Sequence, residues 1–477
     1  MTGNMLTVAV VGHTNTGKTS LMRTLMREAD FGEVSDHPAT TRHVEGAAIL
    51  VEGRQVMALY DTPGLEDSIG LLEHLDSLAG VKRVDGIELV KQFLASSDAE
   101  SRFPQEAKAL RQLLGSDVAL YVIDARDRVL GKHRDELEIL ARCAKPVVPV
   151  LNFTAADDAK VKLWREHLSR VNMHAVAEFD TVVLDDVCEQ RLYEKMRTLL
   201  DAHEATLNTL IEDRRQQRSA VIKASADVIA GALIDVAAHS LFVASGEADQ
   251  VEAALEKLQT AIRDREQKCV DRLLELHRFS PEDCDPGALP IIDGKWGLDL
   301  FAPEALKQFG IKAGGGAATG AAIGFVLDAM TGLASLGAVT AIGAGIGGLL
   351  GAGRSHGQRL MRRLQGEAEL RVDDAAIRLL ATRQIMLTRA LLKRGHAAQQ
   401  PVQMPQPRRL NLPQVSGPSL PPPLQRARTR LDWSHIDRTH ASTYLPAEAA
   451  RTEAVAALSR HVVRIIERPA EAAIEFP

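Results

Sequence analysis

Short apolar runs alternate with amphipathic stretches through the N-terminal part of the chain. The apolar runs are rich in β-branched residues and predict strands; they are residues 5–11, 44–51, 55–60, 118–123, 146–151 and 173–183. The amphipathic stretches have helical periodicity; they are residues 17–28, 132–142, 157–170 and 187–200. This alternation predicts an α/β domain over residues 1–204, with a mainly parallel sheet and helices on both faces.

The hydrophobic spacing becomes helical after residue 204. Apolar residues follow one another at steps of four, three and four in the stretch Val251–Ile262, as on one face of a helix. We therefore predict an all-α C-terminal region. Its expected parts are a helical domain (205–300), a Gly/Ala-rich hydrophobic hairpin with an amphipathic helix near 358–394 (301–396), and a Pro-rich linker (397–427) with a tail helix near 447–467 (397–477).

Composition narrows the classes of function. Aromatic residues make up only 4% of the chain, so its cores must be aliphatic, and the formal net charge is −6. A nucleic-acid surface normally appears as a basic excess, which makes nucleic acid an unlikely partner. The cysteines form no CxxC pair, and the N-terminus lacks the basic region of a signal peptide. We expect a cytoplasmic protein.

A glycine-rich loop follows the first expected strand. Its sequence, Gly12–Thr19, fits GxxxxGK[ST] and precedes a helix. In that setting backbone N–H groups cradle phosphates, Lys18 neutralises the β- and γ-phosphates, and Thr19 binds Mg²⁺. The residues that we expect to contact the nucleotide here are Gly12, His13, Thr14, Asn15, Thr16, Gly17, Lys18, Thr19 and Ser20.

Two more segments fit the same chemistry. Asp61-Thr62-Pro63-Gly64 directly follows an expected strand, so Asp61 can hold the Mg²⁺ shell and the Gly64 N–H can sense the γ-phosphate. Between the two motifs lies Ala39-Thr40-Thr41-Arg42-His43. A threonine in such a loop binds Mg²⁺ only while the γ-phosphate is present.

The order GxxNxGKT, TTR, DTPG resembles the Era and TrmE branch of the translation-factor-related GTPases, over about residues 5–200. The resemblance implies a Ras-like fold, GTP or GDP, and Mg²⁺. It implies catalytic roles for Lys18, Thr41 and Gly64, and Mg²⁺ ligation by Thr19, Thr41 and Asp61. The C-terminal region resembles that of a bacterial group of Era-like GTPases with a domain of unknown function. A homodimer through the G domains is one partner arrangement that we expect.

Four residues bear on how fast such a GTPase turns over. Leu65 stands where Ras-like enzymes place a water-orienting glutamine, so we expect a slow intrinsic rate. Glu66 and Asp67 are nearby carboxylates; they either orient water or are solvated loop acids. Asn15 matches an asparagine that coordinates K⁺ in potassium-dependent relatives, and the alternative is that it only suits a tight loop.

The guanine-reading motif departs from its pattern. The family pattern is NKxD, and this chain has Asn152-Phe153-Thr154-Ala155. Asn152 and Phe153 are the residues that we expect at the base, with Phe153 able to stack on it. Ala155 stands where the family pattern has an aspartate that accepts hydrogen bonds from guanine. The alternative is that Asp157 or Asp158 takes over this role. Discrimination against ATP should therefore weaken, with GTP still preferred through the rest of the resemblance.

Residues 313–353 are almost all Gly, Ala and aliphatic. Glycines four apart, as in Gly316-xxx-Gly320-xxx-Gly324, give a flat helix face for close approach, and basic residues flank the segment at both ends. Three interpretations stay open: a hairpin that contacts or enters the inner face of a membrane, a buried hairpin, or an oligomer or partner interface.

Three functions follow from these observations. The first is a GTPase that hydrolyses GTP to GDP and phosphate and whose nucleotide state switches the helical C-terminal region, at a membrane in one version. The second is an RNA- or ribosome-associated assembly GTPase, although the chain offers no RNA-binding loop with basic flanks. The third is a nucleotide-binding switch with negligible turnover or relaxed base specificity.

Overall fold

The computed structural model describes residues 5–26, 45–79, 84–181, 186–244, 248–279, 291–292, 295–302, 304–305, 325–328, 367–393, 419–436 and 445–468. The chain divides into two compact units, one of residues 1–217 with 392–400 and one of residues 218–391 with 401–477. Each unit is described by itself.

The first unit is an α/β domain. Its elements in chain order are β1 (Leu6–Val11), α1 (Lys18–Met26), β2 (Glu45–Val51), β3 (Arg54–Asp61), α2 (Ser68–Ala79), α3 (Gly86–Leu94), α4 (Asp98–Ser101), α5 (Pro104–Leu114), β4 (Val118–Asp124), α6 (Gly131–Arg142), β5 (Val147–Asn152), α7 (Val161–Arg170), β6 (Ala177–Glu178), α8 (Asp186–Arg197) and the 3₁₀ turn η1 (Asp201–His203). Helix α9 (Glu204–Ala238) begins in this unit and continues into the second.

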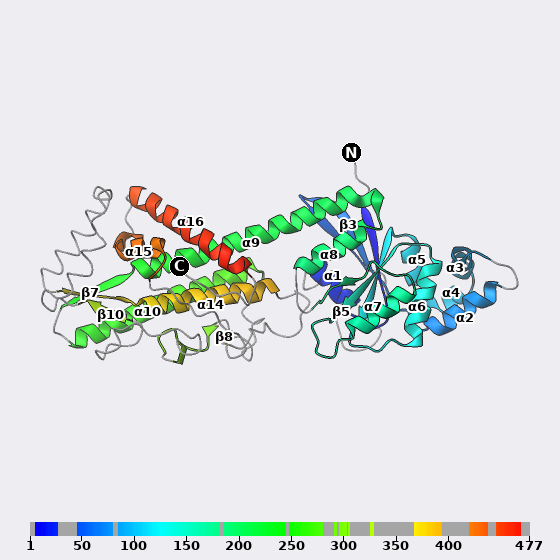
Figure 1. Cartoon of the computed structure of the whole chain (residues 1–477), viewed down its shortest axis with the longest axis horizontal. Helices are drawn as coiled ribbons and strands as arrows, with labels where there is room; N and C mark the ends of the chain where they lie inside the picture. Colours follow the sequence, from blue (N-terminus) through cyan, green and yellow to red (C-terminus); the bar gives the residue numbers. More distant parts are fainter. Residues whose placement is uncertain are drawn as a thin grey trace. The chain divides into compact units, whose positions relative to one another are not determined.

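The sheet of this unit has the order β2-β3-β1-β4-β5-β6. β2 pairs antiparallel with β3, and every other pairing is parallel. Glu52 and Gly53, with φ of 50° and 77°, turn the β2–β3 hairpin. The predicted last strand over 173–183 is wrong in extent, because only Ala177 and Glu178 pair with β5. Figure 1 shows helices on both faces of the sheet, and the predicted α/β class is confirmed.

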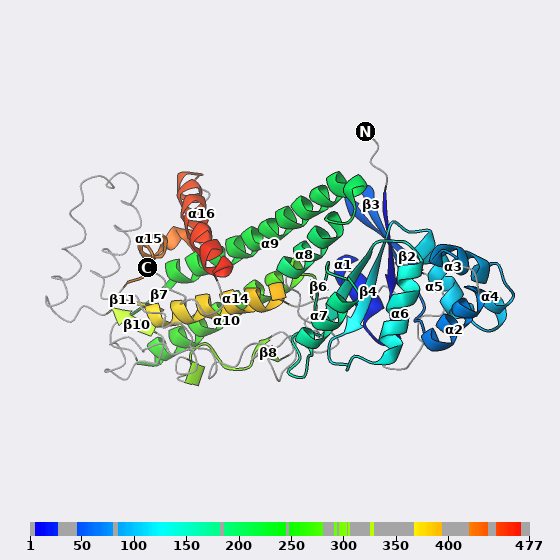
Figure 2. The same ribbon diagram turned by 45° about the vertical axis from the view of Figure 1, so that its right-hand side comes forward.

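Alternate side chains of each strand enter two separate cores. Ala9 and Val11 of β1 join one core, to which α2, α3, α5, α6 and α7 contribute, whereas Val8 and Val10 join the other. This second core takes residues from α1, α8 and the start of α9. Because Leu207 and Leu210 of α9 are buried in it, the first unit extends beyond residue 204, to Gln217. Figure 2 gives a second view of these layers.

The second unit is mainly helical, as the hydrophobic spacing predicts. Its further elements are β7 (Ser240–Ala244), α10 (Ala248–Leu276), β8 (Ile291–Ile292), β9 (Lys295–Trp296), β10 (Phe325–Asp328), β11 (Glu367–Val372), α14 (Asp374–Lys393), α15 (Pro422–Arg428), the 3₁₀ turn η4 (Leu431–Trp433) and α16 (Leu445–Glu467).

A small antiparallel sheet in this unit, of order β10-β11-β7, corrects two predictions. Residues 367–372 form strand β11 instead of part of a helix over 358–394, because their backbone pairs with β7 and β10 on either side. Residues 325–328 form strand β10 within the segment expected to be a hydrophobic helical hairpin. The rest of residues 313–353, including the GxxxG glycines, lies outside the described residues.

The Pro-rich segment is also not a linker throughout. Residues 422–428 form helix α15, because proline is tolerated in a first helical turn and Leu424 and Ala427 are buried. Among the described helices, none combines the length and the apolar content that a membrane crossing requires.

Candidate nucleotide-binding site

The glycine-rich loop lies between β1 and α1. Gly12 and Gly17 have φ of +145° and +89°, and Asn15, which is exposed, has φ of 63°. A Cβ atom on Gly17 would collide with the Asn152 side chain, which is why only glycine fits there. The left-handed turns and this close approach bend the loop ahead of helix α1.

Lys18 turns back over the loop and is buried, with 7% of its surface exposed. Its Nζ donates to the His13 carbonyl over 2.9 Å. Burial lowers the pKa of Lys18, and the charges of Asp61, Glu136 and Glu66 act in the opposite direction. A buried cation at this position is disposed to receive an anion from the ligand.

The two residues that we expect to hold Mg²⁺ are in contact. The Thr19 hydroxyl donates to Asp61 Oδ2, which joins the start of α1 to the end of β3. Thr62 follows Asp61, and its hydroxyl donates to the Val10 carbonyl over 2.7 Å. Thr41, the third expected ligand, lies outside the described residues. Ser20 contributes its carbonyl to Thr24 Oγ1.

The segment after Asp61 packs on the loop. A Cβ atom on Gly64 would lie 2.6 Å from Thr14 Oγ1 and 2.9 Å from the Thr14 nitrogen, so a side chain at Gly64 would displace the loop. Thr14 Oγ1 also donates to Glu66 Oε1 over 3.5 Å. Leu65 is fully buried in the core, whereas Glu66 is exposed. Of Leu65 and Glu66, it is therefore Glu66 that presents a carboxylate to Thr14 of the loop.

Asp67 has a different task. Its Oδ1 accepts from the Gly70 N–H over 2.9 Å, which caps helix α2. Its own N–H donates to Glu106 Oε1 over 3.0 Å, and Glu106 is buried on helix α5. Helix α5 thus holds the residue that directly follows Glu66, a contact that the sequence pattern did not indicate.

His13 faces a buried acid instead of solvent. Its Nδ1 lies 3.0 Å from Glu136 Oε1 and 3.3 Å from the Leu65 carbonyl oxygen. Both partners are acceptors, so Nδ1 carries the proton. Tyr121 donates to Glu136 Oε2 over 2.6 Å, and its burial, with the charge of Glu136, raises its pKa well above the ordinary value. Glu136 was not predicted; its one signal is a carboxylate between the apolar positions of α6.

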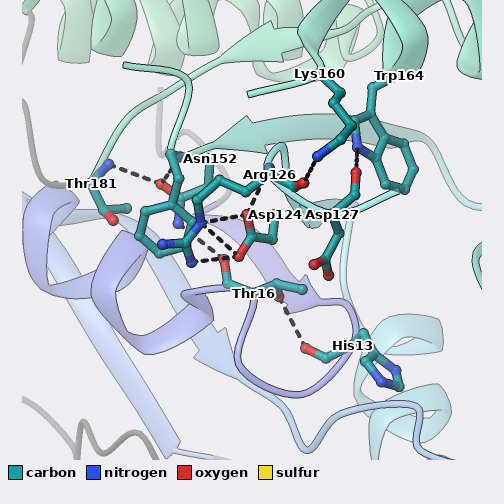
Figure 3. Close-up of polar contacts among 10 residues, drawn as sticks. His13, Thr16, Asp124, Arg126, Asp127, Asn152, Lys160, Trp164 and Thr181 are labelled. Carbon is teal, nitrogen blue, oxygen red and sulfur yellow. Dashed lines mark hydrogen bonds and ion pairs between the residues drawn. The ribbon is translucent and has the colours of Figure 1, made fainter. Parts of the chain in front are cut away.

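Asn152 joins three loops, as Figure 3 shows. Its Nδ2 donates to the Thr16 carbonyl over 3.0 Å, and its Oδ1 accepts from the backbone N–H groups of Phe153 and Thr181 at 2.9 and 3.0 Å. Asn152 is fully buried at the end of β5. It therefore fixes three segments relative to one another: the glycine-rich phosphate loop, the segment after β6, and the loop after β5 (residues 152–158), which carries the expected base-contacting residues and is called the base-reading loop below.

The loop after β5 contacts Arg126 through the Phe153 ring. The Phe153 backbone has φ of 55°, and the Arg126 guanidinium lies 4.1 Å from the centre of the Phe153 ring. The Ala155 N–H donates to Asp180 Oδ2 over 2.9 Å. Asp157 and Asp158 are exposed. Arg126, Asp180 and Thr181 are residues at this site that the motif-based prediction did not include.

The sequence has clear relatives for both units. A family model described as a domain of unknown function (DUF3482) matches residues 165–460, more than half of the chain. The chain belongs to this family. A second model, described as a 50S ribosome-binding GTPase, matches residues 7–153. The predicted P-loop GTPase domain followed by a domain of unknown function is thereby confirmed.

Curated relatives match part of the chain. The tRNA modification GTPase MnmE of Bacteroides thetaiotaomicron is 28% identical over 201 residues, 42% of each chain. MnmE of Desulfitobacterium hafniense is 35% identical over 132 residues, 28% of this chain and 27% of the relative. The chain thus spans less than half the length of these relatives. A solved structure of Era with MgGDPNP and a 16S ribosomal RNA segment is 19% identical, covers 37% of this chain and 52% of that one, and has a TM-score of 0.28.

Proposed function

We propose that this protein binds a guanine nucleotide at Gly12–Ser20 and hydrolyses GTP to GDP and phosphate. The observation that carries the proposal is the convergence of Lys18, Thr19 and Asp61 at the start of α1. Lys18 is a buried cation whose side-chain hydrogen bond goes to a backbone carbonyl. Negatively charged phosphate oxygens would take the place of this carbonyl and form a stronger, charge-assisted bond. The match to a GTPase family model supports the same function.

The donor set fits Mg²⁺. Thr19 and Asp61 bring a hydroxyl and a carboxylate oxygen together, and hard oxygen ligands are those that Mg²⁺ prefers. When bound, the ion would neutralise charge on the β- and γ-phosphate oxygens. Thr41 remains the third proposed ligand. Asn15 and K⁺ remain a proposal that rests on the Era and TrmE resemblance.

Glu66 is the residue that we assign to the attacking water. Leu65 is buried and apolar, and Asp67 caps α2, whereas Glu66 lies against Thr14 of the phosphate loop. A carboxylate there can accept a proton from water while the water oxygen bonds to the γ-phosphorus. The bond from the γ-phosphorus to the β–γ bridging oxygen breaks, and GDP and phosphate are the products.

A titration of the full chain with labelled GDP, GTP and ATP tests the binding, with Lys18→Ala as control. We expect binding of GDP and GTP that the Lys18→Ala variant loses. Single-turnover hydrolysis with and without K⁺ then separates a hydrolase from a switch that only binds. Nucleotide binding that is unaffected by Lys18→Ala would contradict the proposed site.

We further propose that nucleotide state switches the helical C-terminal region and its contact with the inner face of a membrane. The support is the apolar composition and basic flanks of residues 313–353. Hydrogen exchange of residues 218–391 and co-sedimentation with anionic vesicles should both differ between GDP and a non-hydrolysable GTP analogue. Equal exchange and equal vesicle binding in the two states would exclude this role, and a salt-sensitive shift of RNA would favour an RNA-linked GTPase instead.

A further inference from the structure

The base-reading loop carries a cation stacked on an aromatic ring. Arg126 follows strand β4, and Phe153 follows the neighbouring strand β5. The guanidinium carbon lies 4.1 Å from the centre of the Phe153 ring, within the range of a cation–π contact. The tip of the ring lies 3.3 Å from the position that a Cβ atom on Gly17 would take. The stacked pair therefore borders the phosphate loop.

Asp124 fixes the orientation of Arg126. Arg126 Nε donates to both Asp124 oxygens over 3.0 and 3.2 Å, and Nη2 donates to Asp124 Oδ2 over 2.6 Å. Hydrogen bonding to Asp124 raises the pKa of Arg126, so the group stays charged. One side of the planar fork is thus committed to Asp124, and the Nη1 side is directed away from it. The Arg126 side chain is 44% exposed, so a ligand can reach it.

The position that should read the 2-amino group of guanine has no carboxylate. Ala155 stands there, and its N–H is bonded to Asp180, a buried residue after β6. Asn152 uses its oxygen on two backbone N–H groups and one amide hydrogen on the phosphate loop. Arg126 is the charged donor beside this loop, and its Nη1 side is not used on Asp124.

The chemistry of purines then decides which bases fit. Guanine and hypoxanthine present acceptors at O6 and N7, whereas adenine presents a donor at its 6-amino group. An arginine that donates toward this edge attracts a 6-oxopurine and opposes adenine. The 2-amino group, which distinguishes guanine from hypoxanthine, is read by an acceptor such as a carboxylate.

We propose that Arg126, stacked on Phe153, reads the C6 carbonyl of the base and that the site accepts 6-oxopurine nucleotides as a class, inosine nucleotides included. This inference rests on the proposed nucleotide-binding function and names the ligand class of that site. It replaces selection by a carboxylate at residue 155 with selection by a guanidinium at residue 126.

The experiment is a titration of the full chain with GDP, IDP and ADP, in wild-type, Arg126→Ala and Ala155→Asp forms. Wild type should bind GDP and IDP within about threefold of each other and ADP at least about 30-fold more weakly, since a misplaced polar group at a base edge costs one to two decades. Arg126→Ala should bring GDP and ADP within about threefold. Ala155→Asp should make GDP at least about tenfold tighter than IDP.

The control is Arg102→Ala, because Arg102 also stacks on an aromatic ring, Phe103, at 4.7 Å, and is exposed elsewhere in the same unit. It should leave all three affinities unchanged. Wild-type binding of GDP that is at least 30-fold tighter than that of IDP overturns the inference; Asp158→Asn and Asp180→Asn then identify the carboxylate responsible. An unchanged ratio of GDP to ADP in folded Arg126→Ala overturns it equally. With either of these two outcomes, the proposed nucleotide-binding function still stands if Lys18→Ala loses GDP binding. If Lys18→Ala binds GDP as tightly as wild type, both the proposed function and this inference are refuted.

Discussion

Lys18 is a buried ammonium group whose one side-chain hydrogen bond in the described structure goes to the His13 carbonyl. Removing it by Lys18→Ala removes the desolvation cost together with this bond, so we expect the free protein to keep its unfolding midpoint. The nucleotide affinity should fall by about 3 kcal/mol, or roughly 100-fold, because charged contacts to phosphate are lost. Fluorescence titration and thermal unfolding measure the two effects.

The control is Lys91→Ala, which removes an exposed surface ion pair with Glu88 on α3. It should change neither quantity, since exposed pairs contribute little. A loss of folding in Lys18→Ala, with no nucleotide effect beyond it, would show that Lys18 serves the fold alone.

Glu66 is the second residue with a testable role. Glu66→Ala should lower the single-turnover rate of GTP hydrolysis by about 100-fold, the lower end of what general-base catalysis contributes. The affinity for GDP should stay within about threefold, because Glu66 contacts the Thr14 hydroxyl and not the backbone N–H groups of the loop that would hold the phosphates. Rapid-quench assays give the rate, with Glu100→Ala, an exposed acid on α4, as control. An unchanged rate in Glu66→Ala would show that another group activates the attacking water.

At the scale of elements, helix α5 should influence GTP hydrolysis through one buried carboxylate. Glu106 accepts the Asp67 N–H and so holds the segment after Gly64. Glu106→Ala should slow hydrolysis with little change in GDP affinity, whereas Glu106→Gln, which keeps an acceptor oxygen, should retain most of the rate. Equal losses in rate and in GDP affinity for both variants would mean that Glu106 only stabilises the domain.

Asp235 holds elements of the second unit together. It is buried on α9, and it accepts from Arg265 of α10 over 2.8 Å and from Arg451 of α16 over 2.7 Å. Asp235→Ala leaves two largely buried cations without this partner, so we expect a loss of about 3–5 kcal/mol in the free energy of unfolding. Urea unfolding of the full chain measures it, and Asp227→Ala, an exposed acid on the same helix, should cost under about 0.5 kcal/mol. Equal costs for the two would refute the role of this cluster.

At the scale of the whole molecule, a ligand that binds only the first unit should raise the unfolding temperature of that unit relative to the second. GDP at about 100 times its Kd should stabilise the first unit by about 2.7 kcal/mol through mass action. Scanning calorimetry of the full chain should therefore show a GDP-dependent transition. A second transition that is insensitive to GDP would mean that the two units unfold independently, and a joint shift would mean that nucleotide binding is coupled to the second unit.

Much of the first unit could be predicted because its signals are local. Buried parallel strands need continuous apolar runs, and the turn at Gly17 needs a residue that tolerates positive φ. Both signals come from residues that are adjacent in the sequence, so the strands and the phosphate loop can be predicted from it. The second unit gave a weaker signal. The sequence predicts helix at strand β11, because its partners, β7 and β10, are far away in the chain and the structure of so short a segment depends on their pairing.

The sequence by itself determined the α/β class, the position of the phosphate loop and the residue types that meet a nucleotide there, because each depends on periodicity or on a contiguous motif. Only the tertiary structure decided that Glu136 lies behind His13, that Glu106 holds Asp67 and that Arg126 stacks on Phe153. These contacts join residues from separate strands and helices, and which side chains meet depends on the order in which the sheet places its strands. A contiguous motif identifies the residues at the end of a strand, whereas the tertiary structure determines which residues of other strands and helices lie beside them.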